Sequence, residues 1–415
     1  MNRAVVVGSG AREHALAWRL AHSAQVVVTP GNAGIAAHGI ACVDAPATEL
    51  EADLFVIGPE APLVDGLADR LRAQGKVVLG PGSDGARLEG SKAYMKEFLS
   101  AAGVPTAAYG SFTDESSAVA FLATMAPPYV VKTDGLAAGK GVLVTEDLEA
   151  AIADVREKLS GSAFGEAGTT VVVEEGLVGE ECSLLYLCDG HGAIALAPAQ
   201  DFKRVGDGDT GANTGGMGAY APMDSVVGTI ESLVRATVVE PTIAELSRRG
   251  IDFRGVLYAG VMLTKAGPKL LEYNVRFGDP ETEAMMAVVD GDLFAQLRDV
   301  ARGEGGTSLG TVGYAVTVVL ASPGYPEHPR TGLRIDGLGP DGQLATSHED
   351  VVVFHAGTAR DEAGRFVTAG GRVLAVTASG PSVAAARRRA YEASARITFE
   401  GMIMRTDIAA NVSPS

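Results

Sequence analysis

Short apolar runs alternate with helical patterns over the first ninety residues, and this alternation restricts the fold more than any other feature. The runs typical of strands are Ala4–Val7, Val26–Thr29, Leu54–Ile57 and Val77–Leu79. The helical patterns between them are Arg12–His22 and Val64–Ala73. Apolar strands that alternate with helices build parallel sheets with helices on their faces. The chain is therefore predicted to be an α/β protein that begins with a doubly wound parallel α/β domain.

The rest of the chain is too long and too varied for one hydrophobic core. A chain of 415 residues should divide into several domains. Strand patterns dominate residues 126–190, a helical pattern covers Ser225–Arg249, and mixed patterns return near the C-terminus. We predict an N-terminal α/β domain at 1–90, a central domain at 91–305 whose residues 126–190 form a lid-like lobe, and a small C-terminal α+β domain at 306–415.

Charge and hydropathy narrow the range of partners. The 34 basic and 51 acidic residues give a net charge of −17, which argues against non-specific binding of nucleic acid. No apolar run approaches the roughly 20 residues of a membrane span. The first strand follows Met1 almost at once, without a signal-peptide pattern, so a cytoplasmic location is expected. We expect a monomer that acts on small molecules, with no nucleic-acid or membrane partner.

A strand with one polar face carries the strongest chemical signal. Lys269–Val275 is predicted to be a strand that runs into a Gly-Asp-Pro turn. Because side chains alternate along a strand, Glu272, Asn274 and Arg276 should share one face. The opposite, core-facing residues should be Leu271, Tyr273 and Val275. A carboxylate and an amide oxygen suit Mg²⁺ beside nucleotide phosphates, and a guanidinium can grip an anion. A merely hydrated edge strand is the alternative.

Three glycine-rich turns should meet at the carboxyl edge of the N-terminal sheet, where open α/β sheets bind ligands. The turn at 8–14 departs from the dinucleotide fingerprint, because Glu13 stands at the third glycine position. It remains a glycine turn before a helix N-terminus, which suits a phosphate or another anion. Ordinary tight turns are the alternative interpretation. The candidate substrate-binding residues in these turns are Gly8, Gly10, Arg12, Glu13, Gly31, Asn32, Gly58, Pro59 and Glu60.

Two segments of the central region are candidates for holding a nucleotide. The Gly/Ala-rich run at 132–141 is not a Walker A loop, because Gly141 stands where a Ser or Thr must reach the metal. Its backbone N–H groups suit a triphosphate, although an ordinary hairpin loop is the alternative. The strand end and turn at 173–181 can pair with an adenine edge, unless it is only a solvated acidic turn. The candidate nucleotide-binding residues are Lys132, Gly139, Lys140, Glu174, Glu175, Leu177 and Glu181.

A long polar segment at 201–222 is rich in Gly and Asp and shows no periodicity. Such a composition cannot hold one conformation by itself. We predict a lid that orders over substrates and excludes water. The candidate substrate-binding residues in it are Asp201, Lys203, Asn213, Thr214 and Gly216.

Together these stretches resemble the ATP-grasp carboxylate–amine ligases, and among them the phosphoribosylamine–glycine ligase family. The match covers essentially the whole chain, and Arg-Phe-Gly-Asp-Pro-Glu at 276–281 is its most specific motif. The other motifs are Gly-Ser-Gly-Ala-Arg-Glu-His-Ala (8–15), Pro-Gly-Asn-Ala-Gly (30–34), Gly-Pro-Glu-Ala-Pro-Leu (58–63), Leu-Glu-Gly-Ser-Lys (88–92), Asp-Gly-Leu-Ala-Ala-Gly-Lys-Gly-Val (134–142), Asn-Thr-Gly-Gly-Met-Gly-Ala-Tyr (213–220), Phe-His-Ala-Gly-Thr (354–358) and Gly-Gly-Arg-Val-Leu (370–374).

The resemblance implies a central ATP-grasp fold and a ligase of purine biosynthesis. ATP, glycine and 5-phosphoribosylamine would give glycinamide ribonucleotide, ADP and phosphate. Arg276, Lys132 and Lys92 would be the catalytic residues, with both lysines on ATP phosphates. The other roles that the resemblance implies are adenine binding by Glu175 and Leu177, ribose binding by Glu181, and Mg²⁺ (or Mn²⁺) binding by Glu272 and Asn274.

Three other functions remain open at this point. Another ATP-grasp ligase with a different acid or amine would share the metal strand. A nicotinamide-dependent oxidoreductase would use the Gly8–Gly10 turn, but Glu13 and Thr29 count against it. A non-catalytic nucleotide sensor would have no need of the whole phosphoryl-transfer set formed by Lys132, Glu272, Asn274 and Arg276.

Overall fold

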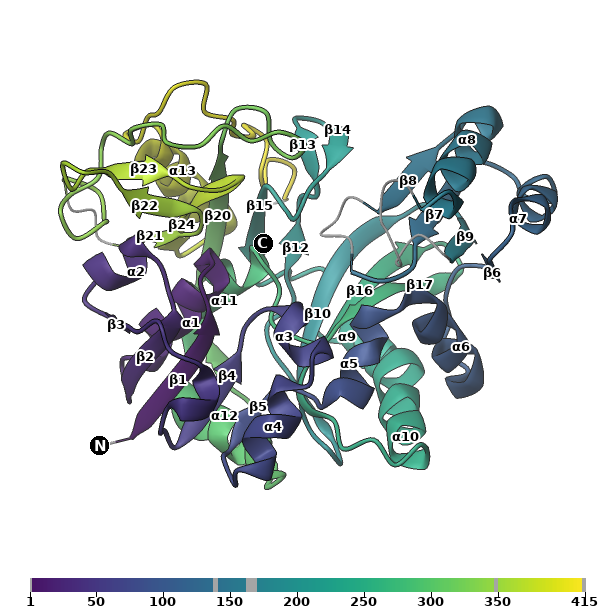
Figure 1. Cartoon of the computed structure of the whole chain (residues 1–415), viewed down its shortest axis with the longest axis horizontal. Helices are drawn as coiled ribbons and strands as arrows, with labels where there is room; N and C mark the ends of the chain where they lie inside the picture. The colour runs from purple at the N-terminus through teal and green to yellow at the C-terminus, as the bar shows by residue number, and fades with distance from the viewer. Residues whose placement is uncertain (1, 137–140, 162–169, 347–349, 413–415) are drawn as a thin grey trace.

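The computed structural model describes residues 2–136, 141–161, 170–346 and 350–412. It begins with a parallel sheet in the order β3-β2-β1-β4-β5, which confirms the predicted doubly wound start of the chain (Figure 1). Its strands are β1 (Arg3–Gly8), β2 (Gln25–Pro30), β3 (Ala41–Cys42), β4 (Leu54–Ile57) and β5 (Val78–Leu79). The run of valines in β1 is buried on both faces, as expected for a central parallel strand.

Short helices cover this sheet. The predicted single helix at 64–73 is wrong, because Gly66 adopts a left-handed conformation with φ of 75° and separates two helices. A 3-10 turn, Ala47–Glu49, precedes β4. The helices are α1 (Ala11–Leu20), α2 (Ala33–Ala37), α3 (Glu60–Val64), α4 (Leu67–Ala73) and α5 (Ser83–Gly90).

Two four-stranded antiparallel sheets follow, in the orders β6-β9-β7-β8 and β11-β10-β16-β17. Their strands are β6 (Tyr109–Phe112), β7 (Tyr129–Thr133), β8 (Val142–Thr145), β9 (Val171–Glu175), β10 (Glu180–Asp189), β11 (Ala193–Ala195), β16 (Arg254–Thr264) and β17 (Gly267–Asn274). The helices beside the first sheet are α6 (Lys92–Ala102), α7 (Glu115–Leu122) and α8 (Leu148–Leu159). Lys132 and Glu175 of the first sheet contact β17 of the second, so both sheets face one site.

A β-bulge changes the alternation in β17. The register shifts between Gly260–Glu272 and Val261–Leu270, which leaves Leu271 as the extra residue. The core therefore receives Leu270, which is fully buried, instead of the predicted Leu271. Beyond the bulge Tyr273 and Val275 are buried as predicted.

The segment at 201–222 is not the irregular stretch that its composition predicts. It forms β12 (Gln200–Asp201), β13 (Arg204–Gly206), β14 (Thr210–Asn213) and β15 (Gly218–Ala221). β13 and β14 make a hairpin, and β15 is buried along its whole length. β12 and β15 join a C-terminal sheet in the order β12-β15-β20-β24-β21, so packing against distant strands supplies the order that local sequence does not.

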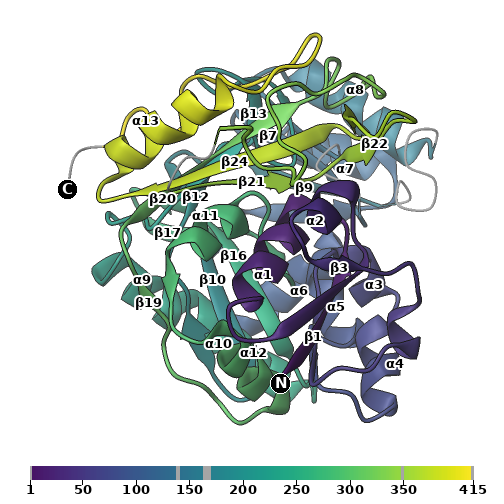
Figure 2. The same cartoon turned by 90° about the vertical axis from the view of Figure 1, so that its left-hand side faces the viewer.

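The C-terminal sheet packs between two helices. Its later strands are β20 (Tyr314–Ala321), β21 (Val351–His355) and β24 (Arg372–Gly380), with the small hairpin β22 (Thr358–Arg360) and β23 (Phe366–Thr368) beside it. α13 (Val383–Ser394) lies along β20 and β24 (Figure 2). α11 (Glu281–Val288) contacts β15, β20 and β24 as well as α1, and so links the sheet to the N-terminal region.

The predicted helix at Ser225–Arg249 is confirmed over most of its length. It begins at Thr229 and contains a π-helical segment, Arg235–Val239, between α9 (Thr229–Val234) and α10 (Glu240–Arg248). The remaining elements are α12 (Leu293–Arg302), β18 (Val289–Asp290) and β19 (Gly310–Thr311). Among the described residues, no helix is both long and apolar enough to cross a membrane.

A buried histidine cluster joins the N-terminal region to the C-terminal sheet. The backbone N–H of His355 donates to His14 Nδ1 at 2.9 Å, so the neutral His14 ring carries its proton on Nε2, 2.9 Å from His38 Nδ1. The His355 ring is held by Thr358 Oγ1 and the carbonyl of Gly342. Burial lowers the pKa of His14, and it lowers the pKa of His355 to about 4.

This cluster predicts acid-sensitive stability. The folded-state pKa of His355, about 4, lies below its ordinary value of 6.5, so the unfolded chain binds more protons between these values. Stability therefore falls as pH drops through this window, and His355 alone should cost about 2 kcal/mol between pH 7 and pH 5. Thermal unfolding at both pH values should show a smaller acid shift in His355→Gln than in the wild type. The exposed His328→Gln should keep the wild-type shift; an equal shift in all three proteins would contradict the assignment.

Candidate active site

The polar face of β17 meets a lysine from the 201–222 segment. Lys203 Nζ lies 3.4 Å from Glu272 Oε1 and makes a closer ion pair with Glu181. The Lys203 ammonium, helped by Lys132 and Lys92, lowers the pKa of Glu272 to about 2 despite burial. Glu272 is therefore an ionised carboxylate, which is the form that a metal ligand requires.

Arg276 lies directly beyond β17 and is gripped by two carboxylates. Its Nη2 lies 2.9 Å from Glu89 Oε1, and its Nε lies 3.3 Å from Glu60 Oε2. The same Nη2 donates to Asn274 Oδ1 at 3.3 Å. Glu89 also accepts from the backbone N–H of Val275 at 2.8 Å. These contacts fix the guanidinium plane beside the oxygen ligands of the predicted metal site.

Lys132 shares a buried carboxylate with a second lysine. Lys132 Nζ and Lys96 Nζ each lie 2.8 Å from an oxygen of Glu174. Lys132 Nζ is also 3.4 Å from the carbonyl of Leu271, the bulged residue. Burial lowers the pKa of Lys96 to about 8, although Glu174 opposes this shift. Glu174, a predicted nucleotide-binding residue, thus orients Lys132 through its own ion pair.

Lys92, the first residue of α6, reaches the loop that follows β7. Its Nζ donates to the carbonyl of Gly135 at 2.8 Å, and burial lowers its pKa. The helix begins here because Ser91 Oγ accepts from the N–H of Tyr94. Glu272, Lys132 and Lys92 lie close enough for their charges to interact. Gly139 and Lys140 lie outside the described residues.

The turn after β9 separates the candidate adenine and ribose contacts. The side chain of Glu175 turns toward Lys269, with a separation of 2.7 Å, and accepts from the N–H of Ala108. Its backbone N–H donates to the carbonyl of Ala108 at 2.9 Å and is therefore already occupied. Leu177 is half-buried in the turn. Glu181, at the start of β10, pairs with Lys203.

The 201–216 segment contains a carboxyl group, an ammonium group and a hydroxyl group among its predicted substrate-binding residues. Burial raises the pKa of Asp201 well above its ordinary range, although the Lys203 ammonium opposes this. The N–H and hydroxyl of Thr214 both donate to the carbonyl of Lys203 at 2.8 Å. Gly216, with φ of 108°, packs so closely on Pro280 that a Cβ would lie 2.4 Å from its Cδ. Asn213 ends β14 in the same hairpin and pairs with Arg204.

The turn at Gly8–Gly10 is filled by the protein itself. Glu13 is 2 % exposed, and its carboxylate accepts from the N–H of Gly10 and from Arg12 Nε at 2.6 Å. A Cβ on Gly8 or Gly58 would lie within 2.6 Å of Glu13 atoms, so both glycines leave room for this carboxylate. The N–H of Gly10 and the Arg12 guanidinium are therefore already paired with a carboxylate of the protein and are not free for an anion.

The other two turns have structural contacts of their own. Asn32 caps α2 through Oδ1, and its Nδ2 donates to the carbonyls of Ser9 and His355 at 2.8 Å. Gly31, with φ of 71°, packs on Cys42. Pro59 precedes α3, and Glu60 opens it. Of these residues, Glu60 contacts Arg276, which is a predicted catalytic residue.

Several site residues escaped the sequence interpretation. Glu89 and Lys96 lie on helices and reach the site only through folding. Arg372 of β24 lies 3.1 Å from Asp279 and donates to the carbonyls of Gly215 and Asp279. The Gly-Gly-Arg motif was a weak signal for Arg372, and the 88–92 motif was an equally weak one for Glu89, whereas no motif marks Lys96.

The donor set fits a divalent cation bound partly by substrate. Glu272 and Asn274 offer a carboxylate and an amide oxygen from alternate positions of β17. Among the described residues, no group of three or more His, Cys, Asp or Glu side chains could hold a metal ion alone. Mg²⁺ commonly takes one or two carboxylates and completes its octahedron with phosphates and water. The fit is therefore to Mg²⁺ or Mn²⁺ delivered with a nucleotide.

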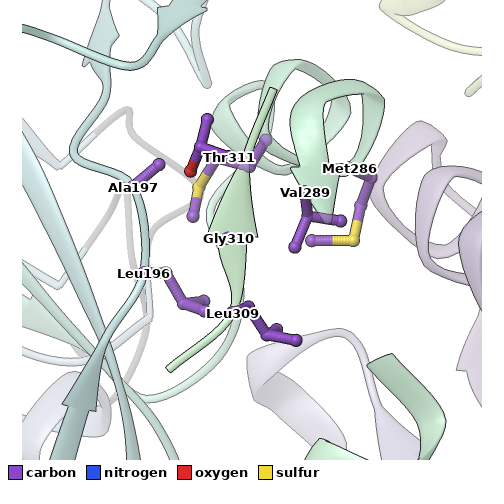
Figure 3. A pocket seen from close by; sticks show the side chains of 8 residues that line it. Leu196, Ala197, Met286, Val289, Leu309, Gly310 and Thr311 are labelled. Atoms are coloured by element: carbon purple, nitrogen blue, oxygen red, sulfur yellow. The ribbon is translucent and has the colours of Figure 1, made fainter. Parts of the chain in front are cut away.

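The apolar recess in Figure 3 is not this site. It has a volume of about 10 Å³, which is close to the minimum for one water. Leu196, Met286, Val289 and Leu309 line it, and it offers no charged group.

Comparison with known proteins agrees with this arrangement. Residues 2–89, 90–282 and 315–411 match the N domain, the ATP-grasp (A) domain and the C domain of phosphoribosylglycinamide synthetase. A phosphoribosylamine–glycine ligase of Caulobacter vibrioides is 47 % identical, with 97 % of both chains covered. The enzyme of the same name from Escherichia coli O6:H1 is 44 % identical, with 98 % of this chain and 97 % of the other covered.

Solved structures show the same relation. The crystal structure of phosphoribosylamine–glycine ligase from Thermotoga maritima has a TM-score of 0.85 and 35 % identity, covering 98 % of this chain and all of that one. The biotin carboxylase of Campylobacter jejuni, at 13 % identity, shares the fold with a TM-score of 0.72, covering 97 % of this chain and 93 % of that one. The chain belongs to the phosphoribosylglycinamide synthetase family, a three-domain family with an ATP-grasp core.

Proposed function

We propose that this chain joins glycine to 5-phosphoribosylamine through a glycyl phosphate, with ATP converted to ADP and phosphate. The observation that carries the proposal is the meeting of Glu272, Asn274 and Arg276 with Lys92 and Lys132 in one site. These groups form a phosphoryl-transfer set, and family membership identifies the acid and the amine. The enzyme is thus an ATP-dependent ligase of purine biosynthesis.

The first step must turn a poor leaving group into a good one. A carboxylate oxygen of glycine attacks the γ-phosphorus of ATP, the bond to the bridging oxygen breaks, and ADP leaves with the electron pair. Lys132, oriented by Glu174, and Lys92 hold the phosphates in line, because positioning and charge stabilisation supply most of the catalysis in phosphoryl transfer. Glu272 and Asn274 would hold a divalent cation, which would supply positive charge beside the phosphates.

Arg276 stabilises the negative charge that develops on the acyl phosphate. Its guanidinium is held by Glu60 and Glu89, so it needs little reorganisation when the charge appears. The amine of phosphoribosylamine then attacks the acyl carbon, the carbon–oxygen bond breaks, and phosphate leaves. The hairpin that carries Lys203 covers the intermediate, which water would otherwise hydrolyse.

We assign the phosphoribosyl group to the turns of the N-terminal sheet. Arg12 donates to the carbonyl of Phe277 at 3.3 Å, and a Cβ on Gly10 would lie 3.8 Å from Asp279 Oδ2. The turns at 8–14 and 58–60 therefore lie against the end of the catalytic strand. Because Glu13 occupies the N–H of Gly10, the ligand must use other donors of these turns.

Replacing the amine with hydroxylamine tests both the substrates and the intermediate. With ATP, Mg²⁺ and glycine present, hydroxylamine should give glycyl hydroxamate and an equal amount of ADP, because it captures the activated acyl group. Hydroxamate is measured by its iron(III) colour and ADP by a coupled assay. With 5-phosphoribosylamine, the product should instead be glycinamide ribonucleotide.

Controls omit ATP, glycine or the metal in turn, and each omission should abolish ADP release above background. Replacement of glycine by alanine measures the selectivity for the acid. Normal ligation without any hydroxamate would count against a free-standing acyl phosphate. Strong ADP release with another acid or amine, and none with glycine, would instead favour a different ATP-grasp ligase.

A further inference from the structure

A C-terminal segment grips the hairpin that carries the site lysine. This segment, residues 403–409, is called the C-terminal clamp here. Arg405 lies at its centre and is 1 % exposed. Its guanidinium lies 2.7 Å from Asp209 at the hairpin tip and 2.7 Å from Asp407 within the clamp. A buried arginine with two carboxylates at these distances is fixed in position.

Arg405 also contacts both neighbours of Lys203. Its Nη1 donates to the carbonyl of Arg204 at 3.1 Å. Its guanidinium carbon lies 5.1 Å from the centre of the Phe202 ring, within the range of a cation–π contact. The residue that ion-pairs with Glu181 and Glu272 therefore lies between two residues that Arg405 holds.

Backbone contacts extend the grip around the hairpin tip. The N–H of Thr406 donates to Asp207 at 2.7 Å, and Asp407 Oδ2 accepts from the N–H of Gly208 at 2.8 Å. Asp209 adopts a left-handed conformation with φ of 54°, which is uncommon for a residue other than glycine. The tip is thus held by the clamp through both backbone and side-chain contacts.

The clamp is itself anchored to rigid elements. Ile403 exchanges backbone hydrogen bonds with Ala321 at the end of β20. On α13, Arg387 donates to the carbonyls of Thr406 and Ile408, and Tyr391 donates to the carbonyl of Arg405 at 3.0 Å. A continuous set of contacts therefore runs from the C-terminal sheet through the clamp to the hairpin.

We propose that Arg405 is a positioning residue for the ligase reaction, which holds Lys203 and its hairpin over the acyl phosphate. This inference rests on the proposed function, because it assigns the hairpin to the covering of that intermediate. Arg405 touches no substrate and acts through Phe202, Arg204 and Asp209. Loss of its grip lets the hairpin move away from Glu272 and admits water.

Three variants test the contact from its two sides. Arg405→Met keeps the aliphatic stem and removes the guanidinium, and Arg405→Lys keeps one charge without the fork. Asp209→Asn removes the hairpin partner at a side chain that is 67 % exposed, and asparagine tolerates the left-handed conformation. Arg330→Met, which removes an exposed ion pair with Glu400, is the matched control.

The expected result is uncoupling rather than simple loss of activity. In Arg405→Met, kcat/KM for glycine should fall roughly 10- to 100-fold, as a misplacement of about 1 Å predicts. KM for ATP should change less than kcat/KM for glycine, because Lys92 and Lys132 lie outside the contact and only Glu181, through Lys203, is connected to it. ADP released per glycinamide ribonucleotide should rise above one, since water then consumes the intermediate. Asp209→Asn should raise this ratio less than Arg405→Met does. Arg405→Lys should give a ratio between those of the wild type and Arg405→Met. Arg330→Met should give the wild-type ratio.

The double variant Arg405→Met with Asp209→Asn should resemble Arg405→Met alone, because both changes remove one contact. An unchanged ratio of ADP to product in Arg405→Met and in Asp209→Asn would overturn the proposal. The proposal would also be overturned if activity fell only in proportion to the amount of folded protein, with the ratio of ADP to product unchanged. If Arg405→Met does not fold, Asp209→Asn decides by the same ratio. A wild-type protein that makes no glycinamide ribonucleotide would instead refute the proposed function.

Discussion

Glu272→Gln should lower kcat on the order of 10³-fold at ordinary Mg²⁺ concentrations. The change keeps the shape of the side chain but removes the only negative charge that the chain offers to the metal from β17, and metal-ion stabilisation contributes several kcal/mol. Folding should be preserved, because Lys203 keeps its ion pair with Glu181. Steady-state ADP release across a range of Mg²⁺ concentrations measures both effects.

The metal dependence separates a ligand role from a general charge effect. If Glu272 binds the metal, higher Mg²⁺ or Mn²⁺ should restore part of the activity of Glu272→Gln. Glu97 is an exposed residue of α6 that pairs with Arg249. Glu97→Gln should leave activity and metal dependence unchanged. Near-normal turnover of Glu272→Gln at ordinary Mg²⁺ would remove this residue from the metal.

Arg276→Lys should lower kcat roughly 100-fold, although the positive charge is kept. The guanidinium contacts Glu60 through Nε and both Glu89 and Asn274 through Nη2, and an ammonium cannot match that geometry. The Glu89 side chain is only 8 % exposed, and lysine would pair with this buried carboxylate less well than arginine does. Arg276→Lys should therefore also lower the melting temperature. Kinetics and thermal unfolding of the same preparation measure the two consequences.

Hydroxamate formation shows where Arg276 acts. If it stabilises charge on the acyl phosphate, Arg276→Lys should lose hydroxamate and glycinamide ribonucleotide in the same proportion. Arg298→Lys, at a partly exposed arginine beside Asp299, is the control and should retain both activities. Full hydroxamate yield with lost ligation would place Arg276 in the second step instead.

Local periodicity predicted the first sheet and the polar face of β17 because both depend on neighbouring residues. The two-residue repeat put Glu272 and Asn274 on one face, and the structure has them there. The same repeat misplaced Leu271, since a bulge depends on pairing with β16 and leaves no local mark. Gly66 ended a helix that apolar spacing alone extended through it.

Long-range contacts account for the rest of the site. Lys96 lies outside every motif, and the motif that contains Glu89 gave it no role. Only folding brings these two residues to Glu174 and Arg276. Glycine turns were interpreted as ligand sites, yet at Gly8 and Gly58 the small residue makes room for Glu13. The same ambiguity applies to any glycine motif, because a missing side chain serves a ligand and a buried neighbour equally well.

The insertion of β12 and β15 into the C-terminal sheet has a consequence for synthesis on the ribosome. These strands are translated long before β20. They can pair with each other at once, but the other edge of β15 stays unpaired until β20 has been made. Arg405, which holds the hairpin tip between them, follows both strands by about two hundred positions in the sequence. The two antiparallel sheets up to β17 are therefore translated before the strand and the arginine that fix this hairpin.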